Sequence, residues 1–262
     1  MKKSNVIALM ATYQPRFTKI VWDAVMSLAP QVDMIYLTVN NPHTPAEKHL
    51  LEMAAAGVHE QTGTPVHLTF LLRDLGDLAK LWMLKHLAHM SPDTTILLCD
   101  DDLIYPADYV DTTVRHLMSL HANGCCPYIS YGGKKLLEKR PYTGWKESWK
   151  KRISVFGGNE VEMLLDIPLT GVTAFHLGEL LITLNLDNRY RNNADLLMAM
   201  WARRCRMFLT CPAFAQNWIT YNPRMTNKAT IWGDMLASPE IQKLTAALAT
   251  EVMEIPFEKS IS

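Results

Sequence analysis

The dominant pattern in the sequence is an alternation of short apolar runs with helical segments, repeated four times before residue 110. Apolar runs of this length are typical of buried strands, and the stretches between them carry apolar residues at helical spacing. Strands that alternate with helices pair in parallel, because each helix carries the chain back across the sheet. The sequence therefore predicts an α/β fold with a mostly parallel sheet and helices on both faces. The predicted strands are Val6–Ala11, Met34–Val39, Val66–Leu71 and Thr95–Leu98.

Proline and glycine mark the expected helix ends. Proline is favoured in the first turn of a helix and glycine just past its end, so we expect one helix to begin at Pro15 and another to stop at Gly57. The predicted helices are Pro15–Leu28, Pro45–Ala56, Asp77–His89, Pro106–His121, Leu177–Ile182, Ala194 to about Cys205, and Pro239–Met253. The second half of the chain adds predicted strands at Pro127–Tyr131, Val161–Leu165, Leu169–His176 and Met207–Thr210.

Composition limits the class of protein. Lys plus Arg (26) balance Asp plus Glu (26), which argues against a dedicated nucleic-acid-binding protein, because such proteins are usually basic. The five cysteines are odd in number and form no CxxC pair, which favours a reducing, cytoplasmic compartment. No window approaches the ~18 apolar residues of a membrane span. The run Val6–Ala11, which follows Lys2 and Lys3, is too short for a signal peptide.

Three consecutive carboxylates, Asp100, Asp101 and Asp102, follow the fourth predicted strand. In open α/β sheets, ligands bind at the carboxyl ends of the strands. Adjacent carboxylates repel one another unless a cation lies among them, and oxygen-only ligands suit Mg²⁺ or Mn²⁺. The cluster therefore predicts a divalent metal site at this edge of the sheet. The alternative is a solvated acidic turn that caps the helix expected from Pro106.

The loops after the other predicted strands lead to the same edge of the sheet. They are Thr12–Arg16, Asn40–Pro42 and Arg73–Gly76. None of them contains GxGxxG, or GxxxxGK followed by Ser or Thr. This excludes the common dinucleotide-binding and P-loop classes.

Four segments match motifs of a known family. Ala11–Arg16 is similar to a T-x-x-P-R loop that faces a nucleotide, and Asp74–Lys80 is similar to a D-x-G-P-A-x-K segment in which Asp77 replaces proline. Cys99–Pro106 is close to the D-D-D-x-x-Y-P form of the DxD motif. Asn193–Leu196 is similar to the acidic pair that starts a catalytic-base helix.

On these motifs the chain resembles the GT-A nucleotide-sugar glycosyltransferases, in particular the family-2-like bacterial enzymes, from about Val6 to Met207. It keeps only the second acid of the pair, Asp195, because Ala194 replaces the first. The resemblance implies a single domain over residues 1–262, with a nucleotide-sugar-binding half to about residue 110 and an acceptor-binding half after it. It also implies inverting transfer from a nucleotide-diphosphate sugar, a UDP-sugar being expected, to a glycan or lipid-linked acceptor in bacterial surface polysaccharide synthesis.

The resemblance also implies roles for single residues. Asp102 is the expected Mn²⁺ or Mg²⁺ ligand, with Asp100 beside it, and Asp195 is the expected base for the acceptor hydroxyl. No histidine follows His176, so the late histidine that many GT-A enzymes add to the metal is missing, and metal affinity is expected to depend on the nucleotide. The residues expected to bind the nucleotide sugar are Thr12, Tyr13, Arg16, Asn40, Asp74, Lys80, Asp100 and Asp101.

Several of these roles have a structural alternative. Asp74 could cap a helix, Lys80 could be a solvated helix charge, and Tyr13 could simply pack. Asp195 could be a carboxylate that interacts with the dipole at a helix start. For the whole protein, the main competitor is a GT-A-like protein that binds nucleotide or glycan without turnover. A sugar nucleotidyltransferase would need a glycine-rich loop after the first strand, and Thr12–Arg16 contains no glycine.

The segment Lys134–Arg152 is strongly basic, and aromatic residues, including Trp145 and Trp149, are interleaved with the charges. We interpret it as a loop or hairpin insertion that receives the acceptor or makes peripheral contact with an anionic membrane surface. A solvated loop with packed aromatics is the alternative. His176 lies where the family lines the acceptor pocket, although a lone histidine in an apolar strand is commonly structural. The expected location is the cytoplasm, including the inner face of the membrane.

Overall fold

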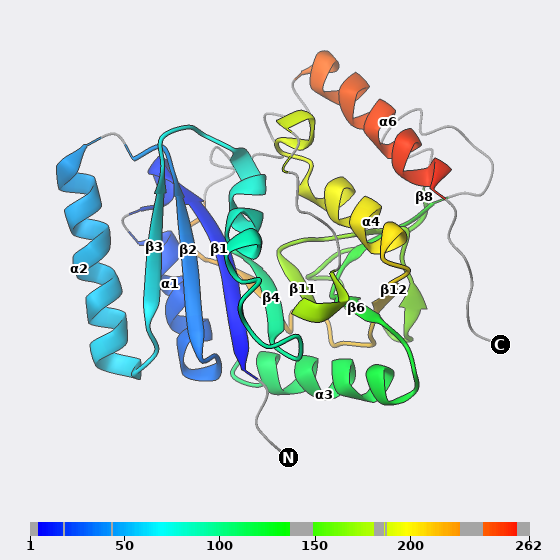
Figure 1. Cartoon of the computed structure of the whole chain (residues 1–262), viewed down its shortest axis with the longest axis horizontal. Coiled ribbons are helices and arrows are strands. Elements are labelled where there is room, and N and C mark those ends of the chain that lie inside the picture. The colour runs from blue at the N-terminus through cyan, green and yellow to red at the C-terminus, as the bar shows by residue number, and fades with distance from the viewer. Residues whose placement is uncertain are drawn as a thin grey trace.

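The computed structural model describes residues 5–17, 19–42, 44–136, 149–180, 186, 188–225 and 238–255. Within them, an eight-stranded sheet runs through the molecule in the order β3-β2-β1-β4-β11-β6-β12-β9 (Figure 1). Its strands are β1 (Val6–Tyr13), β2 (Met34–Asn40), β3 (Val66–Leu71), β4 (Thr95–Asp100), β6 (Pro127–Ser130), β9 (Met163–Leu164), β11 (Val172–His176) and β12 (Phe208–Cys211).

The first four strands are parallel, as the strand–helix alternation predicts. β1 pairs in parallel with β2 and β4, and β2 pairs in parallel with β3. Strand β11 instead runs antiparallel between β4 and β6. The sheet is mostly parallel and the fold is α/β, which confirms the predicted class. The predicted strand Leu169–His176 is wrong at its start, because the chain turns at Thr170 and Gly171 before β11 begins.

Helices cover both faces of the sheet. The longer ones are α1 (Ile20–Leu28), α2 (Pro45–Thr62), the 3-10 helix η3 (Gly76–His86), α3 (Tyr109–Ala122), α4 (Ala194–Arg204) and α6 (Pro239–Glu254). In β1, Ile7 and Leu9 pack with η3, α4 and α6, whereas Ala8 and Met10 pack with α1, α2 and α3. This alternation follows from the two-residue period of a strand. Helices α4 and α6 lie side by side (Figure 1).

Helix α2 is longer than predicted. A capping box between Thr44 and Glu47 fixes its start, and Gly63 ends it with a left-handed φ of 76°. Gly57 therefore lies inside the helix, where a glycine costs about 1 kcal/mol relative to alanine. The predicted end at Gly57 is wrong, because the capping residues at both ends outweigh one interior glycine.

Two other helices differ from the prediction in their start or type. Pro15 lies in the short 3-10 helix η1 (Gln14–Arg16), and the α-helix itself begins at Ile20. The segment predicted as a helix from Asp77 is the 3-10 helix η3, which begins one residue earlier. Side chains three residues apart eclipse each other in a 3-10 helix. Asp77 and Lys80 consequently lie on one side of η3.

Two small sheets accompany the central one in the described residues. The first joins β7 (Gly133–Leu136) to β8 (Trp149–Ile153) and β10 (Ile167–Pro168), and the second joins β5 (Leu103–Ile104) to β13 (Thr220–Tyr221). Strands β7 and β8 are antiparallel, as expected if Lys134–Arg152 is a hairpin insertion. Residues 137–148 between them, including Tyr142 and Trp145, lie outside the described residues.

The two glycines of α2 give a matched test of these helix ends. Gly57→Ala should stabilise the protein by about 0.5–1 kcal/mol, because a Cβ at this helical position meets nothing within 4 Å. Gly63→Ala should destabilise it by about 1 kcal/mol, because φ at this position is 76°. Urea denaturation of the two variants measures both effects. Effects of the same sign would contradict the placement of the helix end at Gly63.

Candidate functional site

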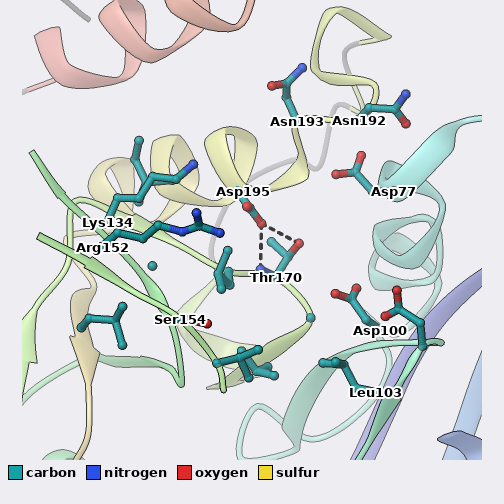
Figure 2. A pocket seen from close by; sticks show the side chains of 18 of the residues that line it. Asp77, Asp100, Leu103, Lys134, Arg152, Ser154, Thr170, Asn192, Asn193 and Asp195 are labelled. Atoms are coloured by element: carbon teal, nitrogen blue, oxygen red, sulfur yellow. Dashed lines mark hydrogen bonds between the residues drawn. The ribbon is translucent and has the colours of Figure 1, made fainter. Parts of the chain in front are cut away.

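A cavity of about 430 Å³ opens where the carboxyl ends of β1 and β4 meet the start of α4. Its size is typical of a small-molecule site. Figure 2 shows Lys134 and Arg152 on one side, Asp77 and Asp100 on the other, and Asp195 with Thr170 between them. The polar and glycine residues that line it include Arg16, Asp77, Lys80, Asp100, Asp102, Lys134, Arg152, Thr170, Gly171, Asn192, Asn193 and Asp195.

The acidic cluster is paired with two buried cations. Arg16 forms ion pairs with Asp101 and, at 3.1 Å, with Asp102, and its side chain is 7% exposed. Lys80 pairs with Asp100, and its side chain is 4% exposed. The Asp101 side chain is 4% exposed and that of Asp102 14%, whereas that of Asp100 is 41% exposed. Because all three carboxylates are ion-paired and two are largely buried, the cluster is not a solvated turn. The N-cap of α3 is Asp108, which lies outside the cluster.

The charges of this cluster depend on one another. Burial, together with the neighbouring charge of Asp100, raises the pKa of Asp102 to about 7 against the opposing effect of Arg16. Burial also raises the pKa of Asp101, again against the effect of Arg16. Although burial alone would lower the pKa of Lys80, the carboxylates of Asp100 and Asp77 raise it above its usual range. Arg16 and Lys80 are therefore held in the charged form, next to three carboxylates.

Tyr105 and Gly171 fix the end of β4. The backbone N–H of Asp100 donates to the Tyr105 hydroxyl at 2.8 Å and to the Gly171 carbonyl at 3.2 Å, and the Tyr105 hydroxyl donates to the same carbonyl at 2.7 Å. A Cβ at Gly171 would lie 1.9 Å from the Asp100 carboxylate. The close approach of these two segments requires glycine at position 171.

Asp195 enters the cavity from the first turn of α4. Its Oδ1 accepts hydrogen bonds from the backbone N–H and the hydroxyl of Thr170, at 2.8 and 2.9 Å. Burial raises its pKa, and the positive charge of Lys134 opposes this shift. The carboxylate is thus oriented by two donors and is a stronger base than an exposed aspartate.

The predicted site residues divide into two groups. Those that line the cavity are Arg16, Lys80, Asp100, Asp102 and Asp195. Those that lie beside it are Thr12, Tyr13, Asn40, Asp74 and Asp101. The proposed contacts of both groups with a nucleotide remain predictions.

The residues beside the cavity make contacts within the protein. The Asn40 side chain donates to the Gly76 carbonyl at 2.9 Å and accepts from the Leu75 N–H at 3.0 Å. Asp74 pairs with Arg191 at 2.5 Å. The Arg16 guanidinium lies 4.9 Å from the centre of the Tyr13 ring. These contacts hold the loops after β1, β2 and β3 in place.

His176 lies away from the cavity. Its ring packs edge-on against His121, with ring centres 5.3 Å apart. Among the described residues, no group of three His, Cys, Asp or Glu side chains has an arrangement that could hold a metal ion by itself. Any ion at Asp100 and Asp102 would need further ligands from a bound molecule.

Three residues of the site were missed as functional by the sequence analysis. Asp77 was noted only as a departure from proline, and Thr170 and Gly171 lay inside a predicted strand. The Asp77 Oδ2 accepts a hydrogen bond at 2.9 Å from the backbone N–H of Ala194. Its departure from the family motif was the available signal, whereas nothing in the sequence around Thr170 indicated its contact with Asp195.

The α/β fold of the chain is like that of a solved glycosyltransferase. It is similar to the mannosyltransferase PcManGT from Pyrobaculum calidifontis, solved in complex with GDP-Man and Mn²⁺, with a TM-score of 0.53 and 14% identity over 96% of this chain and 70% of that one. At this identity the likeness establishes the fold alone. No protein-family model and no curated protein matches the sequence. No helix among the described residues has the length and apolar character needed to cross a membrane.

The ion pairs of the acidic cluster can be tested by replacing Arg16, the cation that Asp101 and Asp102 share. Arg16→Gln should lower the free energy of unfolding by about 3 kcal/mol, because removing one partner leaves buried charges without compensation. The control is Arg115→Gln, since Arg115 and Asp111 form a pair with side chains 69% and 75% exposed. That change should cost less than about 0.5 kcal/mol. Similar losses in chemical denaturation for both variants would contradict the structural role of Arg16.

Proposed function

We propose that this protein is an inverting glycosyltransferase that moves a sugar from a nucleotide-diphosphate donor to an acceptor hydroxyl. The observation that carries the proposal is the cavity itself. An acidic cluster with two buried cations lies on one side of it, and the oriented, partly buried carboxylate of Asp195 lies across from them. The fold it shares with PcManGT, a mannosyltransferase in complex with GDP-Man and Mn²⁺, supports this assignment.

The diphosphate of the donor would bind at the cationic and acidic end. Arg16 and Lys80 would contact phosphate oxygens, and Asp102 and Asp100 would hold Mn²⁺ or Mg²⁺ together with those oxygens. The residues present fit such an ion, because magnesium commonly takes one or two carboxylates and completes its shell with phosphates and water. When bound, the ion would neutralise charge that develops on the leaving diphosphate. The donor base is proposed to be uracil, with guanine, the base of the ligand in PcManGT, as the direct comparison.

Asp195 would act as the catalytic base. Its Oδ1 is held by Thr170, so Oδ2 would accept the proton of the acceptor hydroxyl as that oxygen bonds to the anomeric carbon. The bond from the anomeric carbon to the diphosphate oxygen breaks in the same displacement. The diphosphate leaves with the electron pair, and configuration at the anomeric carbon is inverted.

The hairpin of β7 and β8 would contribute to the acceptor side. Lys134 and Arg152 line the cavity from this hairpin, near Asp195. Their charge is suited to a phosphate or carboxylate on a glycan or lipid-linked acceptor. We place the reaction in bacterial surface polysaccharide synthesis, in the cytoplasm, with the segment Lys134–Arg152 as the part that would approach an anionic membrane surface.

One observation favours a second candidate, a protein that binds nucleotide or glycan without turnover. Asp100 and Asp102 are already paired with Lys80 and Arg16, and no described group of side chains could hold a metal alone. In this candidate, the replacement of the first acid of the catalytic-base pair by Ala194 would go together with the loss of catalysis.

Release of nucleoside diphosphate separates the two candidates. Wild-type protein is assayed with UDP- and GDP-sugars, Mn²⁺ or Mg²⁺, and an acceptor panel. Asp195→Asn should lower kcat by about 10²–10⁴-fold, the usual contribution of a general base, while donor affinity is retained. Asp111→Asn, an exposed change on α3, is the control. Full activity of Asp195→Asn and Asp102→Ala would overturn the mechanism, and tight nucleotide binding without turnover would favour the second candidate.

Metal removal gives a separate prediction. A nucleoside diphosphate should raise the melting temperature when Mn²⁺ is present, because a ligand of the native state stabilises it, by about 2.7 kcal/mol at 100 times Kd. Chelation with EDTA should remove most of the shift, and Mn²⁺ alone should produce little, since the protein supplies an incomplete set of ligands. Asp102→Ala should show no difference between the two conditions. A shift of equal size with EDTA in the wild type would contradict a metal at Asp102.

A further inference from the structure

Asp77 is a carboxylate of the cavity that the proposed mechanism leaves without a role. One of its oxygens, Oδ2, accepts the Ala194 N–H at the start of α4. The other, Oδ1, is shielded from solvent and has no hydrogen-bond partner among the described residues. A buried carboxylate oxygen without a donor is unfavourable by about 1–3 kcal/mol or more. Because Asp77 lines the cavity, a ligand bound there can supply the missing donor.

The contact between Asp77 and Ala194 joins the two departures of this chain from the family pattern. Asp77 stands where the family motif has proline, and Ala194 stands where it has an acid. In the fold these positions are in direct contact across 117 residues of sequence. An acidic side chain carried by η3 therefore lies at the start of α4.

Asp77 lies between the two ends of the proposed reaction. It precedes Lys80 by three residues on the same side of η3, and its charge interacts with those of Lys80, Asp195 and Asp100. Figure 2 shows it on the side of the cavity that holds Asp100, facing the start of α4. In a single displacement, the transferred sugar must lie between the leaving diphosphate and the base. Asp77 therefore flanks the position that this sugar would occupy.

We propose that Asp77 binds a hydroxyl group of the transferred sugar through Oδ1 and thereby selects and orients the sugar, while Oδ2 holds the helix that carries Asp195. This inference rests on the proposed function, since it requires a nucleotide sugar in the cavity. A neutral sugar with a hydroxyl at the contacted carbon satisfies the unpartnered oxygen. A sugar carboxylate at the same place would be repelled by Asp77.

Asp77→Asn tests this role while keeping the helix contact. The asparagine carbonyl oxygen can still accept the Ala194 N–H, but the NH₂ group cannot accept a hydroxyl proton. Titration calorimetry with Mn²⁺ compares UDP with UDP-glucose, and GDP with GDP-mannose, in the wild type, in Asp77→Asn and in Asp111→Asn as the control. The wild type and control should bind the matching sugar nucleotide more tightly than the diphosphate alone. Asp77→Asn should bind the diphosphate with wild-type affinity. The extra affinity that the sugar provides should be about tenfold smaller in this variant.

Monodeoxy derivatives of the matching sugar identify the contacted hydroxyl. In the wild type, the derivative that lacks the contacted hydroxyl should bind more weakly than the parent sugar nucleotide. In Asp77→Asn, that derivative and the parent should bind equally well. A residue that acts only on α4 would not produce an effect confined to one hydroxyl. The melting temperature of each variant reports separately on that structural contribution.

The outcomes separate this inference from the proposed function. If the wild type binds no sugar nucleotide more tightly than its diphosphate and releases no diphosphate from any donor, the proposed function fails and the role of Asp77 fails with it. If the wild type shows the gain and Asp77→Asn keeps it, the proposed function stands. In that case Asp77 serves only to cap α4.

Discussion

The ion pairs between the Asp100–Asp102 cluster and the two buried cations, Arg16 and Lys80, are the constraint on which the site depends. Three carboxylates at the end of one strand would repel one another and resist burial. Arg16 comes from the turn after β1, and Lys80 comes from η3. The first, third and fourth strand–helix units must therefore be in place before the charges of the cluster can be paired. The ion pairs of the cavity can therefore form only when these units of the fold are assembled.

A second set of contacts joins the loop and first turn after β3 to the start of α4. Asp74 pairs with Arg191, Asp77 accepts from Ala194, and Gly76 leaves room for Asn192, whose Oδ1 lies 2.0 Å from where a glycine Cβ would stand. All three contacts involve the loop and first turn after β3. Through them, the position of Asp195 depends on the same segment that carries Lys80. A change in η3 would reach both ends of the cavity.

Much of the first half of the fold could be predicted from the sequence, because its strands and helices carry strong local signals. The four parallel strands, the acidic cluster after β4 and the helix that carries Asp195 followed from hydrophobic runs and motifs. Contacts between distant segments could not be predicted in this way. The hydrogen bonds of Thr170 to Asp195 and of Asp77 to Ala194 join residues 25 and 117 positions apart. The end of α2 was misplaced at Gly57 because local propensity was given more weight than capping at Gly63.

The turn before β11 has a consequence for the dimensions of the cavity. Thr170 holds the carboxylate of Asp195, and the next residue, Gly171, accepts from Tyr105 and from the N–H of Asp100. Adjacent Cα atoms are separated by a fixed distance of about 3.8 Å. The backbone therefore sets the spacing between Asp195 and the end of β4 through two consecutive residues. Because neither residue can shift without breaking a contact at one end, the main chain determines how far Asp195 lies from the acidic cluster, and side-chain changes alone would not alter this separation.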